Sequence, residues 1–285
     1  MEGYVHPAAP ALRGLHERAH RHLDGGPARV LTTSDGGASL TAYDLGSAYA
    51  EARTALTGLV RNLDGATIER LVPACPAWTL KDLVAHLAGE ATDFVDNNFF
   101  LGISEAWRDP EVAATRDAWT AAQVASREST SLEEVLAEWV HRSPRLEDML
   151  SGITPSPNEY PPWLPAAVAD LAVHLHDARS TLHNPGDRSM AASRIGLWVY
   201  IGWLELRLAA CGRPALLIRA SGSREWQLGS GLAAATLTAE TFKLFRALSG
   251  RRSRGQLLSL AWEGDPEPYL DLLSPYELPR SPLIE

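Results

Sequence analysis

The chain has 285 residues, too many for a single small module, and a prior of about 150 residues per domain predicts roughly two domains. Hydrophobic residues make up 45% and charged residues 21%, proportions close to the globular average that exclude wholesale disorder. The net charge of −9 argues against nucleic acid or an anionic membrane as the main partner. With only Cys75 and Cys211, a disulfide scaffold is excluded and a reducing, cytoplasmic compartment is expected.

No targeting or membrane-spanning segment is visible in the sequence. The longest apolar run covers residues 195–204, whereas a helix that crosses a bilayer needs about 20 apolar residues. The N-terminus lacks the basic region and following apolar region of a secretory signal. Residues 1–40 combine a possible helix over residues 11–23 with glycine-rich stretches, and they are expected to form an N-terminal extension.

From residue 41 the pattern is typical of a helical bundle. Apolar residues in steps of three and four predict a first helix up to Leu63. A second helix is expected to begin at Thr79, which can cap it with Asp82 at the third position. A capping box at Ser131–Glu134 begins another helix. That helix is expected to turn inward Leu132, Leu136, Trp139, Val140 and Leu150. Further helices are predicted over residues 111–127, 166–182 and 192–211.

The pattern of apolar and polar residues changes after Pro214. Strands are predicted over residues 215–220, 224–228, 235–238 and 256–262, with a helix over residues 239–248. The fold class expected is therefore mainly α: a four-helix bundle over residues 41–213, then a small α+β domain over residues 214–285. Most of the nine tryptophans lie on apolar stripes, which predicts that they are core residues.

Two of the predicted helices carry a polar strip beside the apolar stripe. The strip on the first of them comprises Thr79, Asp82, His86, Glu90 and Asp93. The strip on the second comprises Asp170, His174, Asp177 and Thr181. If the strips meet, His86, Asp170 and His174 can surround one divalent ion and leave a coordination position open, as a catalytic zinc site requires. The alternative is the ordinary polar boundary of an amphipathic helix, which looks the same in sequence.

Other polar residues carry weaker signals. His16, His20 and His22 have the spacing of ligands on a helix, but they lie among arginines in the extension. Glu90 is expected to be exposed rather than a partner of His86. Cys75 is expected to act as a small apolar residue rather than part of the site.

Two motifs resemble a known family. Residues 72–89, VPACPAWTLKDLVAHLAG, resemble the P-x-W-T-x-x-D-x-x-x-H-L signature of the mycothiol-dependent maleylpyruvate isomerase family, within the DinB-like metalloenzyme superfamily. The segment from Asp170 to Arg179 is similar to the family's acid-x-x-x-His block. The tail around Arg251 is similar to the family's small C-terminal domain. The best-known member has glutamate where this chain has Asp170.

The resemblance implies a DinB-like bundle that binds a divalent metal, usually zinc, through His86, Asp170 and His174. It also implies mycothiol as a thiol cosubstrate, and an actinobacterial source agrees with the arginine-rich composition. Arg179 and Arg251 are candidate anchors for the polar groups of thiol or substrate.

The leading functional hypothesis is an S-transferase in which the metal activates the mycothiol sulfur for attack on a small electrophilic molecule. The alternatives are cis–trans isomerisation of a maleylpyruvate-type substrate, a non-catalytic regulatory bundle that binds metal, and a structural bundle without metal. A small-molecule thiol and a small electrophile are thus the expected partners, with no nucleic acid and no membrane.

Overall fold

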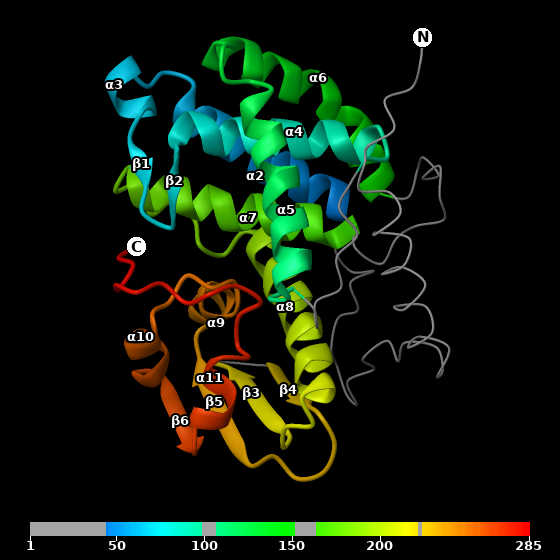
Figure 1. Cartoon of the computed structure of the whole chain (residues 1–285), viewed down its shortest axis with the longest axis vertical. Helices are drawn as coiled ribbons and strands as arrows, with labels where there is room; N and C mark the ends of the chain where they lie inside the picture. The colour runs from blue at the N-terminus through cyan, green and yellow to red at the C-terminus, as the bar shows by residue number, and fades with distance from the viewer. Residues whose placement is uncertain (1–43, 99–106, 152–163, 222–223) are drawn as a thin grey trace.

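The computed structural model describes residues 44–98, 107–151, 164–221 and 224–285. The histidines His16, His20 and His22, the predicted helix over residues 11–23 and most of the proline-rich loop near residue 160 lie outside these ranges. Figure 1 shows the helical bundle in the upper half of the view and the larger sheet in the lower half, with α8 (Ala191–Ala210) reaching from one to the other.

The described elements follow in chain order. The helices are α2 (Leu45–Val60), α3 (Gly65–Ile68), α4 (Leu80–Val95), α5 (Pro110–Ala125), α6 (Leu132–Leu150), α7 (Leu164–Thr181), α8 (Ala191–Ala210), α9 (Thr241–Leu248), α10 (Arg254–Leu258) and α11 (Glu267–Leu270). The strands are β1 (Leu71–Val72), β2 (Cys75–Thr79), β3 (Leu216–Ala220), β4 (Arg224–Leu228), β5 (Ala235–Ala239) and β6 (Ala261–Gly264).

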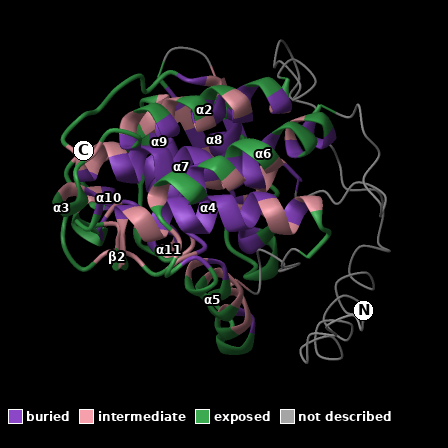
Figure 2. Ribbon diagram, turned by 90° about the horizontal axis from the view of Figure 1, so that it is seen from above, coloured by how far each residue is buried: buried purple, intermediate pink, exposed green. Residues whose placement is uncertain are grey.

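The bundle consists of α2, α4, α6 and α7, each of which packs against two or three of the others. Their apolar stripes meet in a common core, in which Leu56, Leu87 and Leu171 are fully buried. A buried hydrogen bond from the Trp139 indole to the Tyr49 hydroxyl (3.0 Å) joins α6 to α2. Figure 2 shows the buried faces of α4, α7 and α8 turned toward one another.

Local signals determine where the bundle helices begin. The Thr79 hydroxyl accepts from the backbone N–H of Asp82, whose carboxylate accepts from the backbone N–H of Thr79. Ser131 and Glu134 form the same reciprocal arrangement at the start of α6. Both capping boxes satisfy backbone donors that a helix start would otherwise leave unpaired, and both confirm the sequence prediction.

Two helices extend the bundle toward the sheet. α5 packs on α4, and the Arg127 guanidinium just beyond it binds Glu138 of α6 (2.9 Å). α8 packs along α7 and continues to α9. At that crossing Gly196 lets the helices approach closely, because a Cβ atom there would lie 2.5 Å from the Phe245 ring.

The larger sheet has the strand order β4-β3-β5-β6. β3 pairs with β5 in parallel, with Ile218 opposite Leu237, whereas the two outer strands pair antiparallel. Alternate residues of β3 and β5 are buried, which is typical of a sheet with one covered face. The predicted mainly α fold, a helical bundle followed by a small α+β unit, is confirmed; its division into domains at residue 214 stays a prediction.

Some local predictions are wrong. The segment predicted as a strand over residues 256–262 is divided between α10 and β6, because a capping box between Ser253 and Gln256 starts a short helix first. Val140, expected to point inward, is 45% exposed on α6. The hairpin of β1 and β2 was not predicted, because one of its strands is only two residues long.

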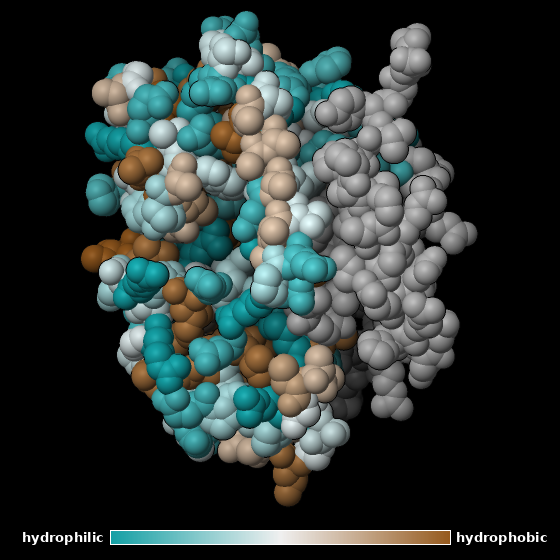
Figure 3. Space-filling view, in the orientation of Figure 1, coloured by the Kyte–Doolittle hydropathy of each residue, from teal (hydrophilic) through white to brown (hydrophobic). Residues whose placement is uncertain are grey.

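On the face shown in Figure 3, hydrophobic residues lie in small groups separated by polar ones. In the part of the chain that the structure describes, no helix is long and apolar enough to cross a membrane.

Candidate metal centre

The donor atoms of His86, Asp170 and His174 lie together, all within 4.8 Å of one another. Asp170 Oδ2 is 3.0 Å from His86 Nε2 and 3.5 Å from His174 Nε2. Two ligands of a tetrahedral zinc ion, each bound at about 2.0–2.1 Å, are about 3.3 Å apart. The two imidazoles and one carboxylate thus have the chemistry and spacing of a three-residue zinc site with an open position.

The packing of α4 against α7 brings these side chains together. Asp170 and His174 lie one turn apart on α7 and therefore share a face. His86 lies in the middle of α4, two turns beyond the capping box that fixes where the helix begins. Both imidazoles are almost fully buried, whereas the Asp170 side chain retains 24% of its exposure.

The second ring nitrogen of His86 is held by α5. His86 Nδ1 lies 2.7 Å from Gln123 Oε1, and the Gln123 amide donates to Asp93 (2.7 Å). Because an amide oxygen only accepts, Nδ1 carries a proton, which leaves Nε2, 3.0 Å from Asp170 Oδ2, as the nitrogen that can bind a metal. A metal-binding histidine is commonly oriented in this way by a second residue.

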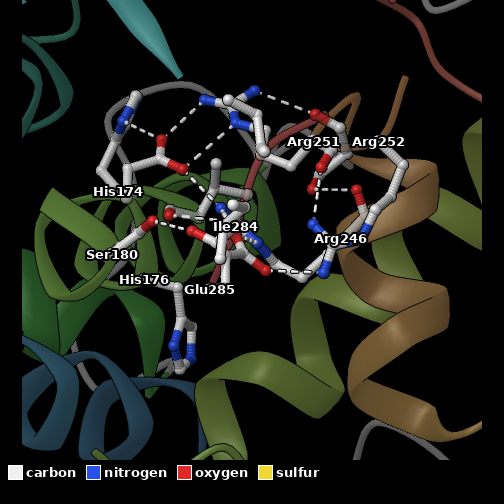
Figure 4. Close-up of polar contacts among 12 residues, drawn as sticks. His174, His176, Ser180, Arg246, Arg251, Arg252, Ile284 and Glu285 are labelled. Carbon is white, nitrogen blue, oxygen red and sulfur yellow. Dashed lines mark hydrogen bonds and ion pairs between the residues drawn. The ribbon is translucent and has the colours of Figure 1, made fainter. Parts of the chain in front are cut away.

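The second ring nitrogen of His174 is held by a buried carboxylate. His174 Nδ1 lies 3.1 Å from Asp177 Oδ2, and Asp177 is fully buried. Asp177 also accepts hydrogen bonds from Arg246 (2.5 Å) and Arg251 (2.9 Å). Arg246 lies on α9, and Arg251 lies in the segment directly after that helix. Figure 4 shows this network continuing from Arg246 and Arg252 to the Glu285 carboxylate.

Charge at the centre favours ionised side chains. Burial alone would raise the pKa of Asp170, but His174 and His86 outweigh it and lower that pKa to about 2. Burial alone would lower the pKa of His174, but the charge of Asp170 and the hydrogen bond to Asp177 raise it to about 10. A divalent cation that replaces the imidazole proton would therefore meet an ionised carboxylate between two imidazoles.

Glu90 lies one helical turn beyond His86 and is 6% exposed, so the expectation that it is exposed was wrong. Its Oε2 atom has no hydrogen-bond partner among the described residues. Burial, reinforced by the negative charge of Asp170, raises the pKa of Glu90 well above its usual range. A raised pKa favours the protonated form of the carboxyl group, and this form can donate a proton.

Cys75, on β2, is also closer to the centre than expected. Its sulfur is 3.9 Å from Asp177 Oδ2 and 3.7 Å from Arg251 Nη2, and its side chain is partly exposed. The hairpin that carries Cys75 also positions Trp78, whose ring centroid is 4.8 Å from that of His86. The hairpin therefore forms one border of the centre.

The centre opens into a cavity of about 720 Å³, a size typical of small-molecule sites. Its lining includes His86, Asp170, His174, Glu90 and Cys75. Residues from α5, α8 and the C-terminal segment complete the described walls, so the cavity lies between the bundle and the end of the chain.

The two candidate anchoring arginines occupy different places. Arg251 lines the cavity, but its guanidinium is bound to Asp177 and to the Ser249 carbonyl oxygen (2.9 Å). Arg179 does not belong to the described cavity lining; it donates to the backbone oxygen of Asp187 (2.8 Å) at the end of α7.

Sequence reasoning did not single out Gln123. It lies in an alanine-rich helix with weak amphipathic character, and its contact with His86 spans 37 positions. The tryptophans near the centre were expected in the core; Trp139 is there, but Trp78, Trp107, Trp119 and Trp203 line the cavity. The sequence did offer one indication that Trp78 lies near the centre, because Trp78 stands directly before the capped helix that carries His86.

Comparison with known proteins identifies similar chains. Residues 49–179 match the family model described as the mycothiol maleylpyruvate isomerase N-terminal domain. The crystal structure of the mycothiol-dependent maleylpyruvate isomerase is 13% identical over 73% of this chain and 88% of that chain, at a TM-score of 0.44. A histidine-to-alanine mutant of that isomerase is 11% identical over 77% and 92%, at a TM-score of 0.46. No curated protein matches the chain.

Proposed function

We propose that this protein is a metal-dependent enzyme that uses mycothiol, because residues 49–179 match the model of the mycothiol maleylpyruvate isomerase N-terminal domain family. The observation that carries the proposal is the cluster of His86, Asp170 and His174 in the lining of a cavity. The contacts of both imidazoles with Gln123 and Asp177 support it further, because metal-binding histidines commonly bind a second residue through their other ring nitrogen.

In this proposal His86 Nε2, Asp170 Oδ2 and His174 Nε2 hold one divalent ion, with zinc as the expected metal. When bound, the ion supplies positive charge that favours the thiolate form of a thiol over the thiol. The residues around it orient the two reactants, and the cavity walls exclude water from them.

Glu90 supplies the proton that the reaction needs. When a thiolate adds to a carbon–carbon double bond conjugated with a carbonyl group, the sulfur bonds to the carbon remote from the carbonyl, and negative charge moves to the carbonyl oxygen. Glu90 lines the same cavity, and its Oε2 atom lacks a hydrogen-bond partner among the described residues. Transfer of a proton from the Glu90 carboxyl neutralises the new charge, and the proton lost by the thiol returns to the Glu90 carboxylate.

S-transfer to a small electrophile is the leading reaction, and the enzyme is then a transferase that releases a thioether. Cis–trans isomerisation of a maleylpyruvate-type substrate is the second candidate, and the family match favours it. Both begin with the same addition. They differ in whether the sulfur leaves again after rotation about the former double bond.

The test of the site is the metal content of the purified protein. We expect about one divalent ion per chain, and we expect His86→Ala to lose most of it while retaining its helix content. His141→Ala is the matched control, because His141 is exposed on α6. Full metal occupancy in His86→Ala would refute the assignment of the ligands.

The test of the reaction is mass spectrometry of mixtures that contain the protein, zinc, mycothiol and a panel of electrophiles, together with maleylpyruvate. A thioether with any electrophile supports the transferase, and rapid isomerisation without a thioether selects the isomerase. If neither occurs and calorimetry detects no thiol binding, the proposal is wrong and a non-catalytic metal-binding bundle remains.

A further inference from the structure

Aromatic side chains dominate the walls of the cavity above the candidate centre. The described lining residues include Trp78, Trp107, Trp119, Tyr200, Trp203 and Tyr276. These rings come from β2, from α5 and the residues just before it, from α8 and from the C-terminal segment, so the fold gathers them from distant parts of the sequence. Rings that only fill a core do not need to border a cavity of about 720 Å³.

Four of the rings form a continuous aromatic wall. The Tyr200 and Trp203 centroids are 5.3 Å apart, and the Trp203 and Trp107 centroids are 5.4 Å apart. Tyr276 follows at 6.3 Å from Trp107, and the Arg116 guanidinium lies 5.5 Å from both of these rings. We call Tyr200, Trp203, Trp107 and Tyr276 the aromatic wall.

The aromatic lining reaches the centre itself. The Trp78 ring lies 4.8 Å from the His86 ring and 5.8 Å from the His174 ring, measured between centroids. A molecule that reacts at the centre therefore has an aromatic surface beside its reacting atoms as well as along the wall. Planar π-systems gain stacking energy on such surfaces beyond that of simple burial.

Most of the guanidinium groups in the described cavity lining are already bound to carboxylates. The lining carries four carboxyl groups, those of Glu90, Asp117, Asp170 and Glu277, and three guanidinium groups, those of Arg116, Arg251 and Arg280. Arg251 is bound to Asp177, and Arg116 is bound to Asp117 at 2.8 Å. A dicarboxylate would thus find two of the three guanidinium groups engaged, whereas an uncharged molecule needs none of them.

We propose that the electrophile is a planar, uncharged aromatic or conjugated molecule that stacks on the aromatic wall and presents its reactive carbon to the centre. The inference rests on the proposed function for the reaction, but not for the binding. With 1,4-naphthoquinone as the probe, a sulfur–carbon bond forms at the quinone ring, the alkene electron pair moves to one carbonyl oxygen, and that oxygen takes a proton. The carbon that now bears the sulfur then loses its hydrogen as a proton, and the second carbonyl oxygen takes up a proton. The product is a hydroquinone thioether, and no further oxidant is needed.

The first experiment measures binding without reaction. We titrate the full chain with 2-naphthol, which is not an electrophile, and follow heat by calorimetry. Trp203→Leu removes the ring but keeps an apolar side chain, and we expect it to weaken binding about 3- to 10-fold. Trp203→Phe should restore most of it. Trp198→Leu is the matched control, because Trp198 lies on the same helix, is 37% exposed and is absent from the cavity lining.

The second experiment compares rates with mycothiol for 1,4-naphthoquinone, 1,4-benzoquinone and maleate, each divided by its uncatalysed rate. We expect the order naphthoquinone, benzoquinone, maleate, and Trp203→Leu should raise KM for naphthoquinone while leaving KM for the thiol unchanged.

The two experiments separate the ways in which these ideas can fail. If maleate reacts best and 2-naphthol does not bind, the inference is overturned and the proposed function stands. If 2-naphthol binds through Trp203 but no electrophile reacts, the proposed function fails and the aromatic site stands. Equal binding of 2-naphthol by Trp203→Leu and the native chain refutes the aromatic wall as the binding surface.

Discussion

Replacing Gln123 tests the centre without touching any of its proposed ligands. In Gln123→Met the side chain keeps nearly the same length and volume but loses the oxygen that lies 2.7 Å from His86 Nδ1. Nothing then holds a proton on His86 Nδ1, so Nε2 is no longer fixed as the nitrogen that binds the metal. The metal should bind more weakly although its three ligands remain.

The size of the effect follows from the contacts of Gln123. Loss of a residue that orients a metal ligand typically costs 10- to 100-fold in affinity, which corresponds to about 1.4 to 2.7 kcal/mol. Asp93 loses its bond from the Gln123 amide but keeps the one from Asn98 (3.0 Å), so we expect little further destabilisation. The variant should therefore remain folded with the helix content of the native chain.

The assay is competition for zinc between the protein and a fluorescent chelator of known affinity, at constant pH and salt. Circular dichroism confirms that each variant is folded. Gln227→Met is the control, because Gln227 is exposed on β4 and far from the centre in sequence. An unchanged zinc affinity in folded Gln123→Met would show that this hydrogen bond does not orient a metal ligand.

Three further variants probe the proton donor, the pH dependence and the helix crossing. Glu90→Gln should keep its metal but lose about 10²- to 10⁴-fold in turnover, measured as kcat at saturating substrate. Burial lowers the pKa of His176 to about 3. The unfolded chain takes up this proton near pH 6.5 and the folded chain does not, so stability is present above pH 6.5 and falls as pH drops toward 3. His176→Phe should flatten this fall in urea unfolding at a series of pH values. Gly196→Ala should destabilise by about 1–3 kcal/mol in the same assay because its Cβ meets Phe245 at 2.5 Å. By contrast, Gly202→Ala on the same helix has free space and should stabilise by about 0.5–1 kcal/mol; equal effects of the two would refute the close crossing.

The parts of the fold that depend on neighbouring residues could be predicted from the sequence. The Thr79 and Ser131 capping boxes each place their signal within four residues, and the structure has both. The four-residue spacing of Asp170 and His174 likewise predicted a shared face. Short-range geometry of this kind is nearly independent of how the rest of the chain packs.

The features that depend on packing between distant elements could not be predicted. Glu90 was expected at the surface, but it is buried and lines the cavity, and a helix period does not show what lies over a polar face. The cavity-lining position of Trp203 depends on where α8 passes the start of α5. Val140 continues the apolar stripe of α6 but lies where no other described element covers it.

The contact of Asp177 with Arg246 and Arg251 has a consequence for how the protein matures. The two arginines follow Asp177 by 69 and 74 positions, so they leave the ribosome well after it. Until they arrive, Asp177 is a carboxylate without its buried counterions, and its burial next to His174 is unfavourable. The helix that carries two of the proposed ligands thus reaches its final state only after the C-terminal unit has docked. Under the proposed function, the metal would then bind only after the C-terminal segment is in place, and a chain whose synthesis stops early would lack a complete metal centre.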